Sequence, residues 1–417
     1  MSELTTSIQE PAVAAPSVRA RLAGVLASGD FRLLWAAQAT TMAGDFFTYV
    51  ALAWVTLDLT HSGAAVAGVL ALQSASLIAV LLFGGAIVDR ATPRSVMFRA
   101  SLVRAVLTGA VAALIAGRLF AAWELVPAAI LLGSVGGLFM PARSSALPSV
   151  ISQDRLEAGN GLLQVTTQVA GVLGPIAAGA MVAWRGNAAA FALDAAAYAL
   201  AAVCIALMRA GRTGAAVRES KRLLSAVGDG LRSVWEDVPL RGMVLILAAI
   251  NFCAAGPLDV GLAVLARYNW GGAQSLGLVL GSFGLGAAIG AVVVSVLPRR
   301  PPLGPTIIGI CFWLGAGLAA FGTLGLAAAV ADAVVTGLAI GFANVIGLSW
   351  IQRRTPPERL GRAMSVIMLA SVGLAPISFA LAAPLVAVSP PLLFAAAGAL
   401  LAATGLGSLA SRQMRNA

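Results

Sequence analysis

The sequence predicts an all-α membrane protein with twelve transmembrane helices in two six-helix repeats, and three observations predict it. Hydrophobic residues make up 59% of the 417 residues, and mean hydropathy is +0.93. Charged residues make up only 11%, against about 25% in a typical soluble domain. Long apolar segments recur along the whole chain, and the second half repeats features of the first. A soluble protein of this size could not cover its surface with so few charges.

A membrane crossing needs about 20 apolar residues, and turn or charge punctuation separates twelve such segments. Spans are expected near 32–57, 65–88, 97–117, 125–146, 160–183, 188–209, 241–266, 274–297, 305–324, 327–349, 360–386 and 389–410. Each span must satisfy its own backbone hydrogen bonds in lipid. Helices rather than strands are therefore expected throughout.

The arginines predict the orientation, because positively charged loops stay on the cytoplasmic side. Only Arg118, Arg185 and Arg267 fall in loops of one side, and Arg104 falls within a span. All other basic residues lie on the opposite side, together with both chain ends. Both termini are therefore expected in the cytoplasm, and the N-terminal tail lacks the continuous apolar core of a signal peptide.

The predicted organisation has five parts. A cytosolic tail of residues 1–28 precedes a six-helix bundle over 29–209, a cytoplasmic loop over 210–240, a second bundle over 241–410 and a tail over 411–417. The loop carries apolar residues at helical spacing between basic residues, which favours an amphipathic helix on the inner membrane surface.

Matching motifs in the two halves indicate an internal repeat. Asp154-Arg155-Leu156 precedes Gly174-Pro175-Ile176 in the fifth span, and Glu358-Arg359-Leu360 precedes Ala375-Pro376-Ile377 in the eleventh. Two parallel six-helix repeats are typical of transporters in which one half rocks against the other. The substrate site is then expected between the halves, near the middle of the membrane.

Composition also excludes several functions. The net charge of +10 does not indicate nucleic-acid binding, because the chain has too little exposed surface for a basic face. Three cysteines lie in separate apolar segments and His61 is the one histidine, so neither a disulfide framework nor a metal site is expected. There is no phosphate-binding Gly-rich loop of the ATPase type and no catalytic set. We expect no cofactor and no enzymatic activity.

Asp45 is the strongest candidate for a functional side chain, because a carboxylate in the middle of a membrane helix costs about 2.5–3.5 kcal/mol on insertion scales. Gln38, Thr41, Asp45 and Thr48 form one polar stripe in the first span. We expect Asp45 to bind the coupling proton or cation and the stripe to line the transport cavity. The alternative is a structural acid that is hydrogen-bonded to a neighbouring helix.

Further polar residues are weaker candidates for the cavity wall. They are Gln164 and Gln168 in the fifth span and Asn251 in the seventh. Arg104 is expected either to reach the interface with its charged end or to pair with an acid such as Asp89. Asp194, Asp259 and Asp332 lie in outer halves of spans and are expected to be interfacial.

Two Gly-containing segments predict mobile helix contacts. Gly85, Asp89, Arg90 and Arg94 end the second span, where the carboxylate could bind the N-terminus of another helix and latch the cytoplasmic face. Gly171, Gly174, Pro175 and Gly179 in the fifth span give a helix that allows close approach and a bend. Its expected partner is the glycine-rich eighth span, and without further information this segment is only a packing device.

These two motifs resemble those of the major facilitator superfamily. Gly85, Asp89, Arg90 and Arg94 match its loop signature, although Thr92 and Pro93 replace a glycine and an arginine. The segment from Gly171 to Gly179 resembles the antiporter motif of the superfamily's exporters, with Ala178 in place of one glycine.

A narrower resemblance is to the macrolide-efflux and enterobactin-exporter branch of proton-driven multidrug exporters. It rests on Phe31-Arg32-Leu33-Leu34-Trp35, Gly44-Asp45 and Pro141-Ala142-Arg143. The resemblance implies a monomeric exporter in the inner (plasma) membrane that carries an amphipathic small molecule (a drug, a macrolide-like compound or a siderophore) outward in exchange for protons. An importer or lysophospholipid flippase on the same fold, or a receptor that does not transport, remains open as an alternative.

Overall fold

The computed structural model describes residues 24–83, 91–209, 232, 235–297, 301–355 and 357–410. These residues are helical or lie in short connections, and no strand occurs among them. Gly85, Asp89 and Arg90, the tails 1–23 and 411–417, and most of the loop 210–240 lie outside the described residues. The expected amphipathic helix of that loop therefore falls outside them as well.

The N-terminal half contains six long helices. They are α2 (Gly29–Thr60), α3 (Gly63–Phe83), α5 (Pro93–Ala116), α6 (Leu125–Val150), α7 (Leu156–Arg185) and α8 (Asn187–Leu207), with short 3-10 turns η1 (Ala122–Glu124) and η2 (Gln153–Arg155). Local sequence fixes several starts. The Ser28 side chain accepts a hydrogen bond from the Phe31 N–H, and Thr92 accepts one from Ser95, as residues preceding a helix commonly do.

The C-terminal half repeats this arrangement with two interruptions. Its elements are α10 (Val238–Ala255), the π-helix η4 (Gly256–Gly261), α11 (Leu262–Tyr268), α12 (Ala273–Val296), α13 (Leu303–Phe321), α14 (Leu326–Arg354), α15 (Pro357–Val372), α16 (Ala375–Val388) and α17 (Pro390–Ala410). The first three form the seventh span. The eleventh span breaks between α15 and α16 just before Pro376, which has no N–H to donate.

Twelve helices among the described residues are long and apolar enough to cross a membrane. The predicted fold class of twelve spanning helices is confirmed. Large apolar side chains such as Val106, Leu173 and Val292 are more than half exposed, as expected where helices face lipid rather than water.

The structure adds two details to the predicted boundaries. Arg143 lies inside α6 rather than in a loop, because this helix continues to Val150 through Pro148. Residues 24–28 do not form a free tail. Val25 is fully buried, the Arg155 side chain donates to the Gly24 carbonyl, and the Ser28 hydroxyl donates to the Val150 carbonyl.

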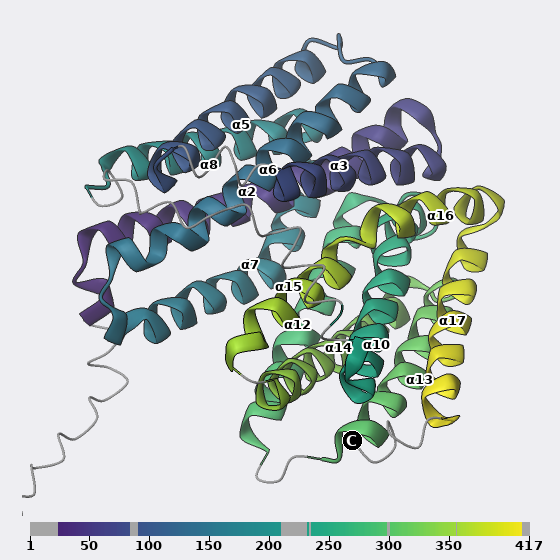
Figure 1. The fold of residues 1–417 in the computed structure, drawn as a ribbon. Helices are drawn as coiled ribbons and strands as arrows, with labels where there is room; N and C mark the ends of the chain where they lie inside the picture. The colour runs from purple at the N-terminus through teal and green to yellow at the C-terminus, as the bar shows by residue number, and fades with distance from the viewer. Residues whose placement is uncertain are drawn as a thin grey trace, which may run out of the picture.

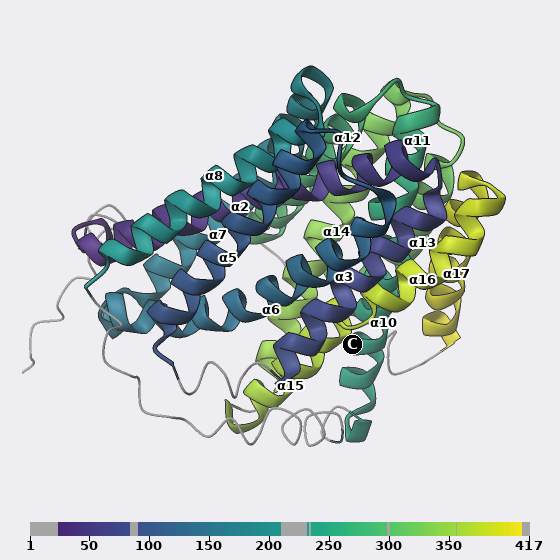
Figure 2. The same cartoon turned by 90° about the horizontal axis from the view of Figure 1, so that it is seen from above.

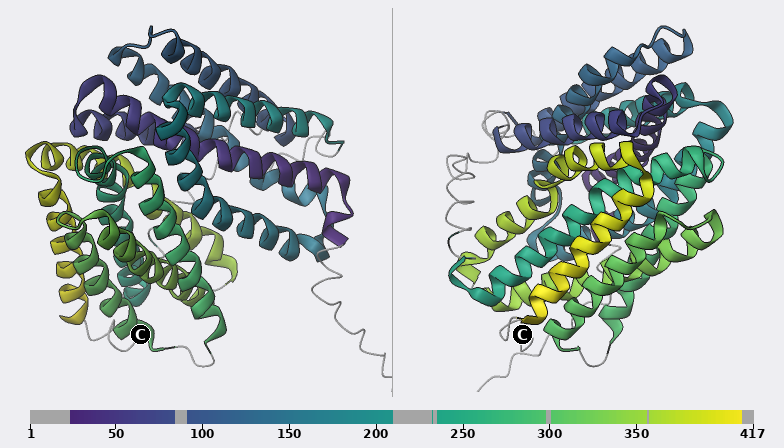
Figure 3. Two further views of the ribbon diagram at one scale, coloured as in Figure 1. Left: turned by 180° about the vertical axis from the view of Figure 1, so that it is seen from behind. Right: turned by 90° about the vertical axis from the view of Figure 1, so that its right-hand side faces the viewer.

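The two halves form separate bundles, drawn purple to teal and green to yellow in Figure 1. They pack against each other through α7 with α12 and through α3 with α16. We call the end of the molecule near the α2–α3 connection the His61 end, and the opposite end the Ser28 end. The bundles meet at the His61 end and splay apart toward the Ser28 end (Figures 1 and 3). Viewed from above, α2 crosses toward α11 of the other bundle (Figure 2).

Candidate transport site

Asp45 lies at the middle of the 32-residue helix α2. One of its carboxylate oxygens accepts two hydrogen bonds, from Arg104 Nη2 at 3.0 Å and from the Tyr198 hydroxyl at 2.7 Å. The side chain nevertheless remains 44% exposed. Asp45 is therefore a carboxylate that is fixed by two hydrogen bonds at one oxygen and is partly exposed.

Arg104 connects Asp45 to a second acid. Its side chain is 6% exposed, its Nε lies 3.5 Å from Asp194 Oδ2, and its guanidinium lies 4.8 Å from the centre of the Tyr198 ring. It therefore does not extend to the interface, and its acidic contacts are Asp45 and Asp194. The expectation that Asp194 is interfacial is wrong, because this residue is 0% exposed between α8, α2 and α5.

The partly exposed side chain of Asp45 lies one turn from a contact between the two bundles. Tyr49 lies one turn further along α2, on the same face. Its hydroxyl donates to Asp259 Oδ1 at 2.5 Å, across the bundle boundary. Asp259 is therefore part of the contact between the two halves, in the π-helical turn of the seventh span.

Other contacts across the bundles lie at the His61 end. Arg267 pairs with Asp58 at 2.9 Å and lies over the Trp54 ring, and the Tyr268 hydroxyl donates to the His61 carbonyl. Together with the Tyr49–Asp259 bond, these are the cross-bundle hydrogen bonds and ion pairs that we identify among the described residues, and all lie on the His61 side of Asp45 along α2. The conformation is therefore closed at the His61 end.

Gln38 and Thr41 do not line the expected cavity, because their side chain positions on α2 face into the N-terminal bundle. They are 2% and 3% exposed. Gln38 donates to the Leu163 carbonyl and to the Thr167 hydroxyl of α7, and Thr41 donates within its own helix. Within the polar stripe, Gln38 thus contacts α7, whereas Asp45 contacts α5 and α8.

Gln164 and Gln168 are placed differently. Gln164 is exposed and Gln168 is half-buried. Gln164 lies eleven residues before Pro175 and Gln168 lies seven residues before it, so both share the face of α7 that carries this proline. Nearer the His61 end, that face contacts α12. Asn251 is half-buried and donates to the Leu247 carbonyl of its own helix.

Helices α7 and α12 touch at backbone distance. A Cβ added at Gly277 would lie 2.3 Å from the Pro175 carbonyl oxygen, and one added at Gly179 would lie 2.5 Å from the Ala273 carbonyl oxygen. Pro175 leaves the Gly171 carbonyl without its helical donor. A Cβ at Gly284 would lie 2.5 Å from that oxygen. The small residues therefore allow the closest contact between the two bundles.

Gly174 belongs to a different contact, which corrects the expected pairing of this residue with the eighth span. A Cβ added there would lie 2.3 Å from the Phe46 ring of α2. Gly171 has room for a methyl group, since nothing lies within 4 Å of an added Cβ. The four motif residues thus have three different environments.

These environments predict unequal effects of adding one methyl group. We expect Gly179→Ala to lower stability by about 1–3 kcal/mol through overpacking, because α12 backbone blocks its Cβ. Gly171→Ala, on the same helix, should remain near wild type. Thermal unfolding of the purified protein in detergent measures both, and equal melting temperatures for the two variants would contradict the packing described above.

Of the four motif residues at the end of the second span, only Arg94 lies among the described residues. Arg94 donates to the carbonyls of Ile205 and Ala206, at the C-terminus of α8, where a positive charge is favourable. Gly85, Asp89 and Arg90 lie outside the described residues, so their role as a latch remains a prediction.

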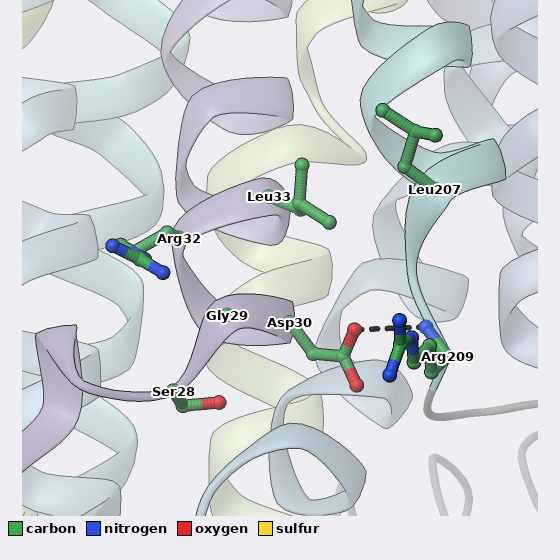
Figure 4. A pocket seen from close by; sticks show the side chains of 7 residues that line it. All are labelled: Ser28, Gly29, Asp30, Arg32, Leu33, Leu207 and Arg209. Atoms are coloured by element: carbon green, nitrogen blue, oxygen red, sulfur yellow. Dashed lines mark hydrogen bonds between the residues drawn. The ribbon is translucent and has the colours of Figure 1, made fainter.

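A pocket at the Ser28 end lies within the N-terminal bundle rather than between the bundles. It is lined by Ser28, Gly29, Asp30, Arg32, Leu33, Leu207 and Arg209 (Figure 4). Asp30 accepts a hydrogen bond from the Arg209 backbone N–H at 2.8 Å. This pocket joins the start of α2 to the end of α8 and is separate from Asp45.

Among the described residues, no three His, Cys, Asp or Glu side chains come together as metal ligands. Cys204, Cys253 and Cys311 are buried and unpaired. The polar centre of the N-terminal bundle is therefore the charged set of Asp45, Arg104 and Asp194 with Tyr198.

Comparison with known proteins decides the family. The family description "Major Facilitator Superfamily" matches residues 34–380, which is most of the chain. The chain belongs to the Major Facilitator Superfamily. It is a membrane transporter and not an enzyme, and the superfamily resemblance found in the sequence is confirmed.

Individual relatives of this superfamily member are distant. "Multidrug efflux pump Tap" of Mycolicibacterium fortuitum is 26% identical over 374 residues, covering 86% of this chain and 89% of that protein. "Uncharacterized MFS-type transporter y4rN" of Sinorhizobium fredii is 27% identical over 279 residues, covering 65% of this chain and 67% of that protein.

Solved structures agree on the fold. The inward-facing structure of a bacterial homologue of the iron transporter ferroportin matches with a TM-score of 0.72 at 18% identity, covering 91% of this chain and 98% of that one. A nucleoside transporter, NupG, matches with a TM-score of 0.71 at 11% identity.

Proposed function

We propose that the chain is a secondary active exporter that moves an amphipathic small molecule outward in exchange for protons, with Asp45 as the proton-binding carboxylate. The observation that carries this proposal is the position of Asp45. It lies at mid-helix, is held by Arg104 and Tyr198, and keeps a side chain that is 44% exposed. A carboxylate so placed can exchange a proton with water that enters between the bundles.

The direction of transport is proposed from two supporting facts. Relatives covering most of the chain are named as multidrug efflux pumps. The α7–α12 contact at Pro175 and Gly179 uses the residues that resemble the exporter motif. An amphipathic substrate fits a space bordered by Gln164 and Gln168 on a helix that is otherwise largely apolar.

Arginine distribution supports the orientation. Arg94, Arg155, Arg209 and Arg354 lie at the Ser28 end, which is therefore the cytoplasmic end by the positive-inside rule. The described conformation is then closed to the outside. We propose the plasma membrane as the location, a monomer as the working unit, and the division into bundles at 29–209 and 241–410.

The experiment is transport into inside-out membrane vesicles. A fluorescent lipophilic drug should accumulate when the vesicle interior is acidified, and a protonophore should abolish this accumulation. Accumulation that is driven by ATP in the presence of the protonophore, or drug uptake by whole cells that express the protein, would contradict proton-driven export.

A further inference from the structure

The two acids beside Arg104 are held unequally. Asp45 accepts from Arg104 at 3.0 Å and from Tyr198 at 2.7 Å, and water can reach its open side. Asp194 is fully buried, its ion-pair contact is the 3.5 Å approach of Arg104 Nε to Oδ2, and the Thr48 and Thr108 hydroxyls lie close to its carboxyl. Its other oxygen, Oδ1, has no hydrogen-bond partner. The hydrogen-bond donors near the two acids therefore stabilise the ionised form of Asp45 better than the ionised form of Asp194.

The charged residues around the two acids also favour Asp45 as the ionised carboxylate. Helices α2, α5 and α7 pack against α8, which carries Asp194. The charged residues that they place near it are Asp45 of α2 and Arg104 of α5. The titratable residues of α7, Glu157 and Arg185, lie in its first and last turns. Arg143 of α6 interacts electrostatically with Asp45. Two guanidiniums thus act on Asp45, whereas Asp194 has Arg104 alone, at 3.5 Å, and an ionised carboxylate that is buried without a close partner is unfavourable.

The surroundings of the unpartnered oxygen suit a neutral acid. A Cβ added at Gly44 would lie 2.5 Å from Asp194 Oδ1, so the α2 backbone closes over this oxygen and excludes water. The nearby Thr48 hydroxyl is also buried without a partner. This hydroxyl can accept a hydrogen bond from a protonated Asp194 and donate one to an ionised Asp194, so it accommodates both states of the acid.

We propose that Asp45 and Asp194 share one proton and that Arg104 neutralises whichever carboxylate is ionised. In the described conformation the proton resides on Asp194 and Arg104 binds Asp45. When Arg104 shifts from Asp45 to Asp194, the proton passes from Asp194 to Asp45, whose exposed side can then release it. Each state of the set thus holds one proton and one ionised carboxylate beside Arg104. This inference deepens the proposed function, since it replaces a single proton-binding residue by two acids and a positioning residue, Arg104.

Infrared difference spectra of the purified protein at neutral pH test the sharing. The spectrum of each single variant, Asp194→Asn or Asp45→Asn, is subtracted from that of the wild type. Each difference should show the loss of one protonated carboxylic acid and no net loss of an ionised carboxylate, because the remaining acid is ionised beside Arg104. The double variant should lose one acid and one carboxylate. Asp58→Asn is the matched control, because its pairing with Arg267 should make it lose a carboxylate.

A carboxylate loss without an acid loss in either single variant would overturn the proposal. The half-exposed position of Asp45 makes its asparagine variant usable even if Asp194→Asn does not fold. These spectra need neither substrate nor a pH gradient. Failure of the proposed function, seen as proton-independent export by the wild type, is therefore distinguishable from failure of the shared-proton site.

Discussion

Asp45→Asn is expected to reduce proton-driven efflux to the level of vesicles that lack the protein. The asparagine keeps an oxygen that can accept from Tyr198, so the helices around it should stay packed, but it cannot bind and release a proton. Drug accumulation in inside-out vesicles under an imposed pH gradient measures the effect.

The control for this variant is Asp58→Asn. Asp58 is an acid of the same helix that pairs with Arg267 at the His61 end, away from the middle of the membrane. It should keep a clear response to the pH gradient. If Asp45→Asn transports as well as the wild type at equal protein amount, Asp45 is a structural acid, which is the alternative that the sequence leaves open.

Arg104→Met is expected to have the largest effect on stability. It removes the one guanidinium that contacts both Asp45 and Asp194 and leaves the Asp45 carboxylate without this cation. Breaking a fully buried ion pair by removing one partner costs about 3–5 kcal/mol, and the 44% exposure of Asp45 should keep the loss below that range. The melting temperature and the yield of folded protein should both fall.

A second substitution shows whether Arg104→Met lowers stability because a charge is left unbalanced or because side-chain packing is lost. Adding Asp45→Asn to Arg104→Met removes the unbalanced carboxylate and should recover most of the lost stability. Arg267→Met is the surface control, because exposed ion pairs contribute at most about 1 kcal/mol. An Arg104→Met protein that melts like the wild type would mean that Arg104 does not balance these acids.

Much of the fold follows from the sequence alone, because each span must be apolar for about 20 residues and the loops must carry the charges. The break before Pro376 and the π-helix at Asp259 could not be predicted in this way. They depend on how the seventh and eleventh spans pack against other helices, and hydropathy carries no such information.

The candidate site is predictable only in part. A lone carboxylate at mid-span singles out Asp45, but its partners Arg104, Asp194 and Tyr198 come from helices far away in sequence. A stronger signal was available for Arg104, because a membrane-embedded arginine needs an acid nearby. For Gln38 and Thr41, helical periodicity gives the shared face but not which neighbour covers it. For Gln38 that neighbour is α7.

The two bundles also explain why the small residues of α7 have different roles. Gly174 faces Phe46 within its own bundle, whereas Pro175 and Gly179 face α12 in the other. Glycine spacing alone identifies a surface for close packing. It does not say which glycine meets which helix, because adjacent positions on a helix differ by about 100° in direction.

Proton movement driven by substrate tests the central claim most directly. Purified protein in liposomes that contain a pH-sensitive dye would be given a gradient of a transported lipophilic drug, without a pH gradient. Antiport predicts that protons move against the direction of drug flow, and that Asp45→Asn abolishes this movement. Drug transport by the wild-type protein without any accompanying proton movement would contradict the claim.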